Sequence, residues 1–239
     1  MSLKTDNLKK IYGSREVVKG MNIEINKGEI VALLGKNGAG KTTTFKMILG
    51  VVRPDSGDIL FEDSVITRLP PDKRARTGIT YLPQEPSVFK KASVADNFRI
   101  IMEEIGYGKE TAEKRIDDLL KEFDIENLKD SMAYTLSGGE RRRVEIARAL
   151  IIDPHYFLLD EPFSGVDPLT IVELQKLIKY LSSREIGILI SDHNVHDTFD
   201  IANRVYIIED GVVIAEGLPE EMAYNSLAKE KFLGKDFIF

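Results

Sequence analysis

A glycine-rich stretch, "GKNGAGKT" at 35–42, has the composition and spacing of a phosphate-binding loop. It follows the apolar run "IVALL" and precedes "TTTFKMILG", so it matches G-x-x-x-x-G-K-[ST] between a strand and a helix. Backbone N–H groups of 37–41 can bind a phosphate at the positive end of that helix. We expect Lys41 to reach the β- and γ-phosphates and Thr42 to bind Mg²⁺. The alternative is a glycine turn that only packs a helix on a sheet.

Polar residues also follow the ends of four short apolar runs. Gly35 follows "IVALL", Gln84 follows "ITYLP", Asp160 and Glu161 follow "YFLL", and His193 follows "ILISD". In a parallel sheet covered by helices, ligands bind beyond the carboxyl ends of the strands. We therefore expect these residues to converge at one edge of a sheet, beside the phosphate loop.

These strand-end residues have the chemistry needed for hydrolysis of a bound phosphate. Asp160 can bind Mg²⁺ directly or through water, and Gln84 can bind the metal or hold the attacking water. Glu161 can orient that water and take its proton, a contribution of roughly 10²–10⁴-fold in rate. His193 can hydrogen-bond the γ-phosphate. Each also has a plainer interpretation: Gln84 as a loop residue, Glu161 as a helix-start acid and His193 as a capped, solvated histidine.

A glycine pair lies near the start of "YTLSGGERRRVEIARAL" at 134–150. Ser137 and Glu140 have the spacing of a capping box, which predicts that a helix begins here. Gly138 and Gly139 occupy the first turn, where each costs about 1 kcal/mol relative to alanine. Without a Cβ, the N–H groups of a helix start can close on a phosphate. We expect this pair to serve binding at the expense of local stability.

The three arginines that follow, at 141–143, do not indicate a nucleic-acid site. The chain of 239 residues has a net charge of −6, so a surface that binds polyanions is not expected. We predict that these arginines form a solvated or ion-paired face.

The composition argues against several other kinds of site. The chain has no cysteine, which removes disulfides and thiol catalysis, and three scattered histidines do not predict a zinc site. The N-terminal residues lack a signal-peptide run, and no apolar run approaches the ~18 residues that span a bilayer. We expect a cytoplasmic protein that reaches a membrane only through a partner.

Strand and helix patterns alternate along the chain, which predicts an α/β fold with a mostly parallel sheet covered on both faces. Strands are expected at 29–34, 79–82, 156–159 and 188–191, and helices at 41–50, about 93–106, 110–122, 138–151 and 168–182. Residues 205–217 predict a hairpin with Asp210 and Gly211 at its turn. A further helix is expected from Pro219. The helical residues 86–153 are interpreted as a subdomain inserted into the α/β core.

In this order, the motifs resemble the nucleotide-binding subunit of ATP-binding-cassette (ABC) transporters. They are Tyr12, "GKNGAGKT", Gln84, "LSGGE" at 136–140, "YFLLDEP", "SGVD" at 164–167 and His193. The resemblance implies a P-loop NTPase (RecA-like) ABC ATPase core with a mixed or parallel sheet, an N-terminal antiparallel β-subdomain and an inserted helical subdomain. It implies a nucleotide-binding core over about 1–85 and 154–217, a helical subdomain over 86–153 and a C-terminal helical tail over 218–239.

The resemblance also implies that the chain binds ATP with Mg²⁺ and hydrolyses it. The expected catalytic residues are Glu161, His193 and Gln84, and the expected metal ligands are Thr42, Gln84 and Asp160. Tyr12 is expected to stack on adenine, with ordinary strand packing as the alternative. The phosphate-loop residues expected around the nucleotide are Gly35, Asn37, Gly38, Ala39, Gly40, Lys41, Thr42 and Thr43. Lys36 stands where the family usually has proline.

In this family the "LSGGE" motif contacts the γ-phosphate bound to the other cassette of a head-to-tail dimer. By that resemblance Ser137, Gly138 and Gly139 act in trans, and Asp167 helps to link the two sites. The expected partner is therefore a second copy of this chain.

A finer resemblance is to the lipopolysaccharide-export branch of the family. The segments "LPQEPSVFKKASVADN", "LSGGERRRVEIARAL", "SDHNVHDT" and "FLGKDFIF" carry it. It implies two membrane permease chains as partners, on the cytoplasmic face of the inner membrane. Phe89 matches the apolar residue of the groove that receives the permeases, although Ala92 stands where a larger residue is usual; the alternative for Phe89 is a core aromatic. Phe237 and Phe239 resemble a tail that pairs subunits, or form an end folded onto its own domain.

Three other functions are weighed against this one. The first is a sister ATPase, above all that of branched-chain amino-acid importers. The second is an ABC ATPase of translation or DNA repair, which usually has two cassettes or a long coiled-coil insertion. The third is a nucleotide-binding scaffold without turnover, which the presence of Glu161 disfavours.

Overall fold

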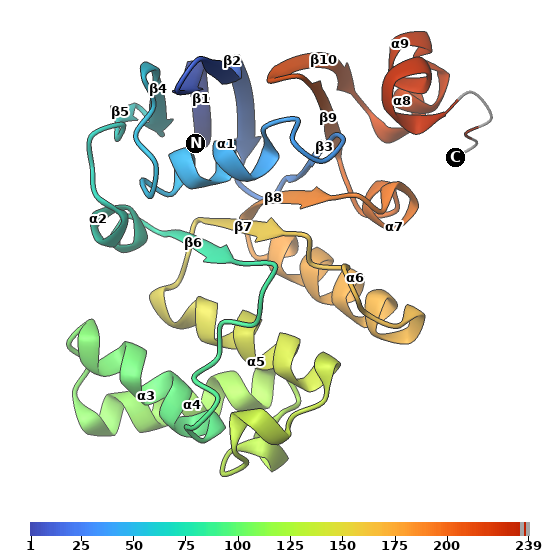
Figure 1. The fold of residues 1–239 in the computed structure, drawn as a ribbon. Helices are drawn as coiled ribbons and strands as arrows, with labels where there is room; N and C mark the ends of the chain where they lie inside the picture. The colour runs from blue at the N-terminus through green and yellow to red at the C-terminus, as the bar shows by residue number, and fades with distance from the viewer. Residues whose placement is uncertain (235–236, 238–239) are drawn as a thin grey trace.

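Two β-sheets carry the fold of the residues that the structure describes, 1–234 and 237, in this computed structural model (Figure 1). The strands are β1 (Ser2–Tyr12), β2 (Arg15–Asn26), β3 (Ile30–Leu34), β4 (Ser56–Phe61), β5 (Ser64–Val65), β6 (Ile79–Leu82), β7 (Tyr156–Asp160), β8 (Gly187–Asp192), β9 (Arg204–Glu209) and β10 (Val212–Gly217). The helices are α1 (Lys41–Ile48), α2 (Pro71–Arg76), α3 (Val94–Glu104), α4 (Lys109–Glu122), α5 (Gly138–Ala149), α6 (Pro168–Ser183), α7 (Val195–Phe199), α8 (Pro219–Tyr224) and α9 (Ser226–Ala228).

The central sheet has the strand order β10-β9-β3-β8-β7-β6, and every pair in it is parallel except β10 with β9. Strands β3, β7 and β8 are buried along their whole length, as their unbroken apolar runs require. The predicted strands and the mostly parallel sheet are confirmed. In the register, Leu34 pairs with Asp192 and Asp160 pairs with Ser191. The carboxyl ends of these strands therefore lie level at one edge.

The predicted hairpin is formed by β9 and β10, with its turn at Asp210 and Gly211. Both turn residues have left-handed backbone angles, with φ of 46° and 84°, which is the two-residue turn that suits the twist of the strands. The Gly211 N–H donates to the Ala39 carbonyl at 3.0 Å, and the Gly211 carbonyl accepts from the Lys19 N–H at 2.8 Å. The hairpin turn thus joins β2 to the phosphate loop.

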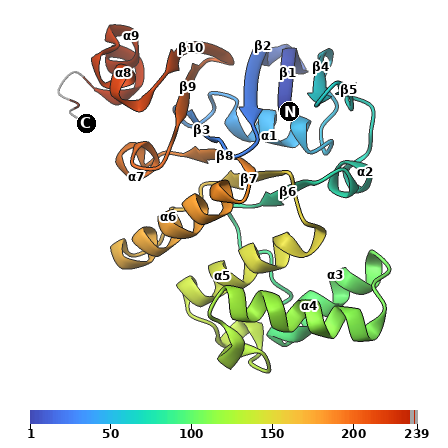
Figure 2. The same ribbon diagram turned by 180° about the vertical axis from the view of Figure 1, so that it is seen from behind.

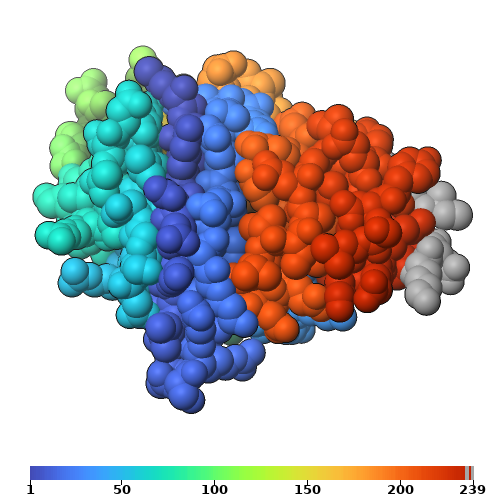
Figure 3. All heavy atoms as spheres, turned by 90° about the horizontal axis from the view of Figure 1, so that it is seen from above, coloured from blue at the N-terminus to red at the C-terminus, as the bar shows by residue number. Residues whose placement is uncertain are grey.

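The N-terminal sheet has the order β2-β1-β4-β5 and is antiparallel throughout, so the N-terminal antiparallel subdomain is confirmed. Its inward residues, among them Leu3, Leu8 and Met21, share one apolar core with Phe45 of α1. Seen from above, the blue N-terminal strands lie between the cyan segment that contains β4 and the orange and red C-terminal segment (Figure 3).

The predicted helices are confirmed as α1, α3, α4, α5 and α6, with ends that differ by a few residues. Helices α3, α4 and α5 lie together on the side of the central sheet opposite the N-terminal sheet (Figures 1 and 2). Their apolar residues, such as Phe98 and Ile116, join one core with Phe157 and Ile188 of the sheet. Among the described residues of 86–153, β-pairing is limited to one bridge, Ser93 with Met132.

The C-terminal segment begins with α8 at Pro219, as predicted. The Phe237 ring stacks on His196 at 4.8 Å between centroids and meets Phe199 edge-on at 5.7 Å. Phe237 therefore packs on its own chain, whereas Phe239 lies outside the described residues. Within the part of the chain that is described, no helix combines the length and apolarity needed to cross a membrane.

Candidate nucleotide-binding and catalytic site

The phosphate loop lies between β3 and α1, as its sequence predicts. Gly38 and Gly40 have φ angles of 82° and 109°, which glycine adopts without strain. A Cβ at Gly40 would also approach the Val17 carbonyl of β2 to 3.0 Å. The loop therefore runs close against the N-terminal sheet, and Gly40 caps α1 with no side chain bonded to the first N–H groups of the helix.

Lys41 is buried within this loop. Its Nζ donates to the Gly35 carbonyl at 2.5 Å and to the Lys36 carbonyl at 3.2 Å. Burial lowers the pKa of Lys41, whereas the nearby carboxylates of Glu161, Asp160 and Asp192 act to raise it. A cationic group thus stands at the start of α1, among carbonyls that neutralise part of its charge.

A cavity of about 120 Å³ opens over the loop. It is lined by Val17, Asn37, Gly38, Gly40, Lys41, Thr42, Thr43 and Glu161. Gly35 and Ala39 lie buried behind it, and a Cβ at Gly35 would collide with the Ile208 carbonyl of β9. Most of the loop residues predicted to bind nucleotide therefore surround this cavity, and Gly35 and Ala39 support it from below.

Glu161 is the meeting point of three strand ends. Its backbone N–H donates to the Ser191 carbonyl at 2.7 Å, and its φ of 47° is unusual for a residue with a side chain. Its Oε2 accepts a hydrogen bond from Gln84 Nε2 at 2.8 Å and lies 3.5 Å from His193 Nδ1. The structure brings the three predicted catalytic residues into one cluster.

Asp160 is buried beside this cluster, and both of its carboxylate oxygens have partners. Tyr81 Oη donates to Oδ2 at 3.1 Å and Ser191 Oγ donates to Oδ1 at 2.5 Å. Burial and the Asp160 charge raise the pKa of Tyr81, which keeps that hydroxyl a donor. Sequence reasoning missed Tyr81 and Ser191, which fix the orientation of the Asp160 carboxylate.

Asp192 is a further residue that sequence reasoning missed. Its fully buried carboxylate accepts backbone hydrogen bonds from Phe163 at 3.1 Å, His193 at 2.7 Å and Asn194 at 2.9 Å. It therefore ties the turn after Glu161 to the turn that carries His193. The signal was present, because Asp192 ends the apolar run "ILIS" just as Asp160 ends "YFLL".

The second glycine pair lies at the start of α5, and the capping box is confirmed. Glu140 N–H donates to Ser137 Oγ at 3.3 Å, and Ser137 N–H donates to Glu140 Oε2 at 2.8 Å. The Ser137 hydrogen bonds lower the pKa of Glu140. A Cβ at Gly138 would meet nothing within 4 Å, whereas one at Gly139 would lie 3.2 Å from the Thr170 side chain. Gly138 is therefore bare and faces open space.

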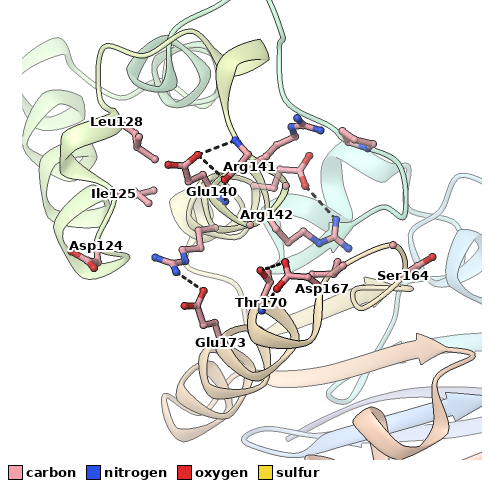
Figure 4. A pocket seen from close by; sticks show the side chains of 18 of the residues that line it. Asp124, Ile125, Leu128, Glu140, Arg141, Arg142, Ser164, Asp167, Thr170 and Glu173 are labelled. Atoms are coloured by element: carbon pink, nitrogen blue, oxygen red, sulfur yellow. Dashed lines mark hydrogen bonds and ion pairs between the residues drawn. The ribbon is translucent and has the colours of Figure 1, made fainter.

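A cavity of about 800 Å³ lies in front of this helix start. Ser137, Gly138 and Gly139 line it on one side, and Ser164 and Asp167 line it on the other. Figure 4 shows Asp167 turned toward Thr170, whose Oγ1 donates to Asp167 Oδ2 at 2.6 Å as part of the α6 cap. We call this the signature cavity.

The signature cavity and the phosphate-loop cavity share no lining residue in the described part of the chain. The two are connected through Gln84, which lines the signature cavity and hydrogen-bonds Glu161 of the phosphate-loop cavity. Ser137, Gly138 and Asp167 thus line a cavity to which no residue of the phosphate loop contributes.

The three consecutive arginines near the start of α5, at 141–143, are engaged with protein groups. Arg143 pairs with Glu173 at 2.5 Å, and Arg141 donates to the Leu136 carbonyl at 3.0 Å. Arg142 pairs with Glu145 at 3.2 Å but is buried rather than solvated, and burial lowers its pKa. Arg142 and Arg143 are ion-paired, as predicted, but Arg142 belongs to the interior.

The two remaining candidate contacts, Tyr12 and Phe89, are both exposed. Tyr12, at the end of β1, is 49% exposed with the Lys10 ammonium 5.4 Å from its ring centroid. Phe89 is 44% exposed with the Arg148 guanidinium 5.5 Å from its ring centroid, so it is not a core aromatic. Both rings are available to a ligand or partner.

Comparisons with known proteins agree with this geometry. Residues 18–164 match the model of the family described as "ABC transporter". The chain is 48% identical to the lipopolysaccharide export system ATP-binding protein LptB of Escherichia coli K12, over 99% of this chain and 98% of that protein. It is 47% identical to the LptB of Acidithiobacillus ferridurans, over 98% of each chain. A solved ADP conformation of an ATP-binding cassette of an ABC transporter superposes with a TM-score of 0.88 at 27% identity, covering 98% of this chain and 100% of that one.

Proposed function

This chain belongs to the ABC transporter family, as one of its ATP-binding and ATP-hydrolysing subunits, and we propose that the transport it drives is the export of lipopolysaccharide. The relatives from Escherichia coli and Acidithiobacillus ferridurans, at 48% and 47% identity, are named for lipopolysaccharide export and match this chain over nearly its full length. The names of these relatives support lipopolysaccharide as the transported substrate. The geometry of the cluster around Glu161 supports the hydrolysis of ATP.

The single observation that carries the proposed chemistry is the position of Glu161. Glu161 lines the phosphate-loop cavity, and its Oε2 accepts a hydrogen bond from Gln84 Nε2 and lies 3.5 Å from His193 Nδ1. A carboxylate so placed can accept a proton from a water that attacks the terminal phosphate, while Gln84 fixes its orientation. His193 is exposed and can hydrogen-bond the phosphate. We assign Glu161 as general base and the other two as its catalytic partners.

Lys41, the loop N–H groups and the hydroxyls of Thr42 and Thr43 form the proposed phosphate site. The N–H groups at a helix start favour anions, and the Lys41 ammonium supplies a full positive charge. Tyr12 is exposed at the end of β1 and is the proposed stacking partner of adenine.

The residues present fit Mg²⁺ bound together with phosphates. In the described residues no group of three His, Cys, Asp or Glu side chains is arranged to hold a metal by itself. Mg²⁺ commonly takes one or two protein carboxylates and completes its shell with water and substrate phosphates. Thr42, Gln84 and Asp160 would hold it, and the bound metal neutralises phosphate charge. The donors from Tyr81 and Ser191 set the Asp160 carboxylate in one orientation.

The signature cavity is the proposed contact for a second copy of the chain. Ser137 and Gly138 present a helix start to open space, apart from the phosphate loop of their own chain. In a head-to-tail pair, that helix start would close on the terminal phosphate held by the partner, and Asp167 would lie between the two sites. This arrangement explains why a helix retains two glycines in its first turn.

Phe89 and the adjacent lysines, Lys90 and Lys91, are the proposed contact for membrane permease subunits. All three are exposed on the segment that follows Gln84. A permease element docked there would contact residues that lie five to seven positions after Gln84 in this chain. By this proposal the chain is peripheral on the cytoplasmic face of the inner membrane and is held there by its partners.

Purification of the chain from the membranes of its host, with identification of the proteins that accompany it, tests the proposed transport. We expect two permease chains and ATP hydrolysis that responds to added lipopolysaccharide. Recovery with permeases of an amino-acid importer, or with ribosomes or DNA at physiological salt, would contradict the proposal. A Phe89→Ala variant should lose the permeases, and a Tyr224→Ala variant, which removes an exposed ring on α8, should keep them.

A further inference from the structure

The segment between Gln84 and Phe89 is held by side chains and lacks a regular backbone ladder. It leaves β6 at Leu82 and does not enter a helix until Val94. Backbone groups that lie in the interior need partners, since an unmade hydrogen bond there is costly. For residues 83–89, the partners come largely from α5 and α3.

Glu145 of α5 is the centre of this arrangement. It is 3% exposed, and its Oε1 accepts hydrogen bonds from the Ser87 N–H at 2.5 Å and from Ser87 Oγ at 3.3 Å. Its Oε2 accepts from Arg142 Nη1 at 3.2 Å, and that same nitrogen donates to the Pro83 carbonyl at 3.0 Å. One buried carboxylate thus reaches Ser87 directly and Pro83 through Arg142.

Arg148, about one turn further along α5 than Glu145, also binds this segment. Its Nη2 donates to the Ser87 carbonyl at 2.9 Å and to Ser87 Oγ at 2.7 Å. Its Nη1 donates at 3.2 Å to Asn97 Oδ1, which also accepts the Phe89 N–H at 2.8 Å. The Arg148 guanidinium faces the Phe89 ring. Ser87 therefore has both its backbone N–H and its carbonyl bound by α5.

A buried carboxylate with one buried and one half-buried guanidinium group is expensive to desolvate, and an apolar cluster of similar volume can be as stable. A charged cluster is favoured over an apolar one where two segments must be held in one orientation, because charge-assisted hydrogen bonds are directional. Here the directed contacts join the segment that carries Gln84 to the helix that begins with Ser137 and Gly138.

We propose that Arg142, Glu145 and Arg148 form a clamp that locks residues 83–89 to α5, and that Glu145 is a positioning residue for Gln84. Through the clamp, a partner that pushes on Phe89 moves the start of α5 and the Gln84 amide together. The proposal deepens the proposed function, because it rests on Gln84 acting in hydrolysis at Glu161.

Glu145→Gln keeps the shape of the side chain but removes the charge that Arg142 and Ser87 bind. The matched control is Glu113→Gln, which breaks the ion pair of Glu113 with Arg99 at 2.5 Å between two helices of the same group. Arg148→Lys is the second clamp variant, since it keeps the positive charge but loses the forked donors to Ser87. It carries the test if Glu145→Gln does not fold.

Amide hydrogen exchange of the nucleotide-free chain tests the clamp without any need for hydrolysis. We expect the peptide that covers 84–89 to exchange about tenfold faster in Glu145→Gln, the scale of one lost charge-assisted hydrogen bond. The peptides of β3 and α1 should be unchanged, and the control variant should exchange like the wild type. Unchanged exchange at 84–89 in both clamp variants would overturn the clamp.

Steady-state hydrolysis tests the positioning of Gln84. We expect Glu145→Gln to lower kcat about tenfold while the affinity for ATP changes by less than about threefold, because the phosphate loop is untouched. Faster exchange at 84–89 with an unchanged kcat would overturn the positioning role. A wild-type chain that does not hydrolyse ATP, alone or with its partners, would overturn the proposed function, and the exchange measurement would still decide the clamp.

Discussion

The side-chain amide of Gln84 donates a 2.8 Å hydrogen bond to Oε2 of Glu161, although 77 positions separate the two residues. The contact exists because β6 and β7 are adjacent parallel strands, so that both chain segments emerge at the same edge of the sheet. It links the proposed base, the segment that carries Phe89 and the signature cavity. A change in the segment that carries Phe89, or in the signature cavity, can therefore reach the Glu161 carboxylate.

Gln84→Ala removes the hydrogen bond from Gln84 Nε2 that orients the Glu161 carboxylate. Loss of a hydrogen bond to a charged group predicts a fall in kcat of roughly ten- to a hundredfold. The affinity for ATP measured without Mg²⁺ should change little, because Gln84 does not line the phosphate-loop cavity. Glu85→Ala, at the exposed neighbouring position, is the control for steady-state hydrolysis and should match the wild type. Equal rates for Gln84→Ala and Glu85→Ala would exclude the assigned role.

Lys41→Ala removes the buried cation of the phosphate loop. We expect ATP affinity to fall by about a hundredfold or more, since several charge-assisted contacts to phosphate are lost together. Equilibrium binding of a fluorescent ATP analogue measures it. Lys36→Ala removes an exposed lysine from the same loop and should bind ATP almost as the wild type does. Retained binding in the Lys41 variant would show that the Lys41 ammonium serves only to bond the loop carbonyls and does not bind ATP.

Gly138→Ala separates stability from function. A Cβ there meets nothing within 4 Å in one chain. The free energy of unfolding should therefore stay equal or rise by up to about 1 kcal/mol. ATP hydrolysis should nevertheless fall steeply, because the added methyl would stand between the helix start and the phosphate of the second copy. Gly108→Ala, at the equally open cap of α4, is the control and should leave hydrolysis intact. Full activity in Gly138→Ala would count against the trans contact.

Tyr156→Phe is expected to stabilise the fold. The Tyr156 hydroxyl is buried without a hydrogen-bond partner among the described residues, and burial raises its pKa. Removing a buried unpaired polar group should add about 1–3 kcal/mol to the free energy of unfolding. Tyr206→Phe is the opposite case, because its hydroxyl accepts from Arg204 Nη1 at 3.0 Å. Denaturant unfolding should rank Tyr156→Phe above the wild type and Tyr206→Phe below it; the reverse order would show that Tyr156 has a partner.

Patterns within one element were enough to predict much of the fold. The capping box at Ser137 and Glu140 and the turn at Asp210 and Gly211 each depend on residues at most three positions apart, and both occur as predicted. The buried strands were visible as apolar runs. The short elements β4, β5 and α2 were not predicted, because they have too few residues to show a period and depend on their neighbours.

The chemistry between elements was harder to predict. Positions at strand ends predicted that Gln84, Glu161 and His193 would lie together, because parallel strands end at the same edge. The partners that orient them, such as Tyr81 and Asp192, come from pairings that no local pattern reveals. Glu145 looks like any polar residue of a charged helix, and its burial depends on the segment that folds over it.

The most direct test of the account is the hydrolysis rate of Glu161→Gln with ATP binding measured on the same preparation. The variant keeps the size of the side chain and its place beside Gln84 but cannot take a proton from water. The account predicts that ATP binding is retained, that phosphate release falls by roughly 10²-fold or more, and that an ATP-bound dimer accumulates. Phosphate release at the wild-type rate, with binding intact, would contradict the assignment of Glu161 as the catalytic base.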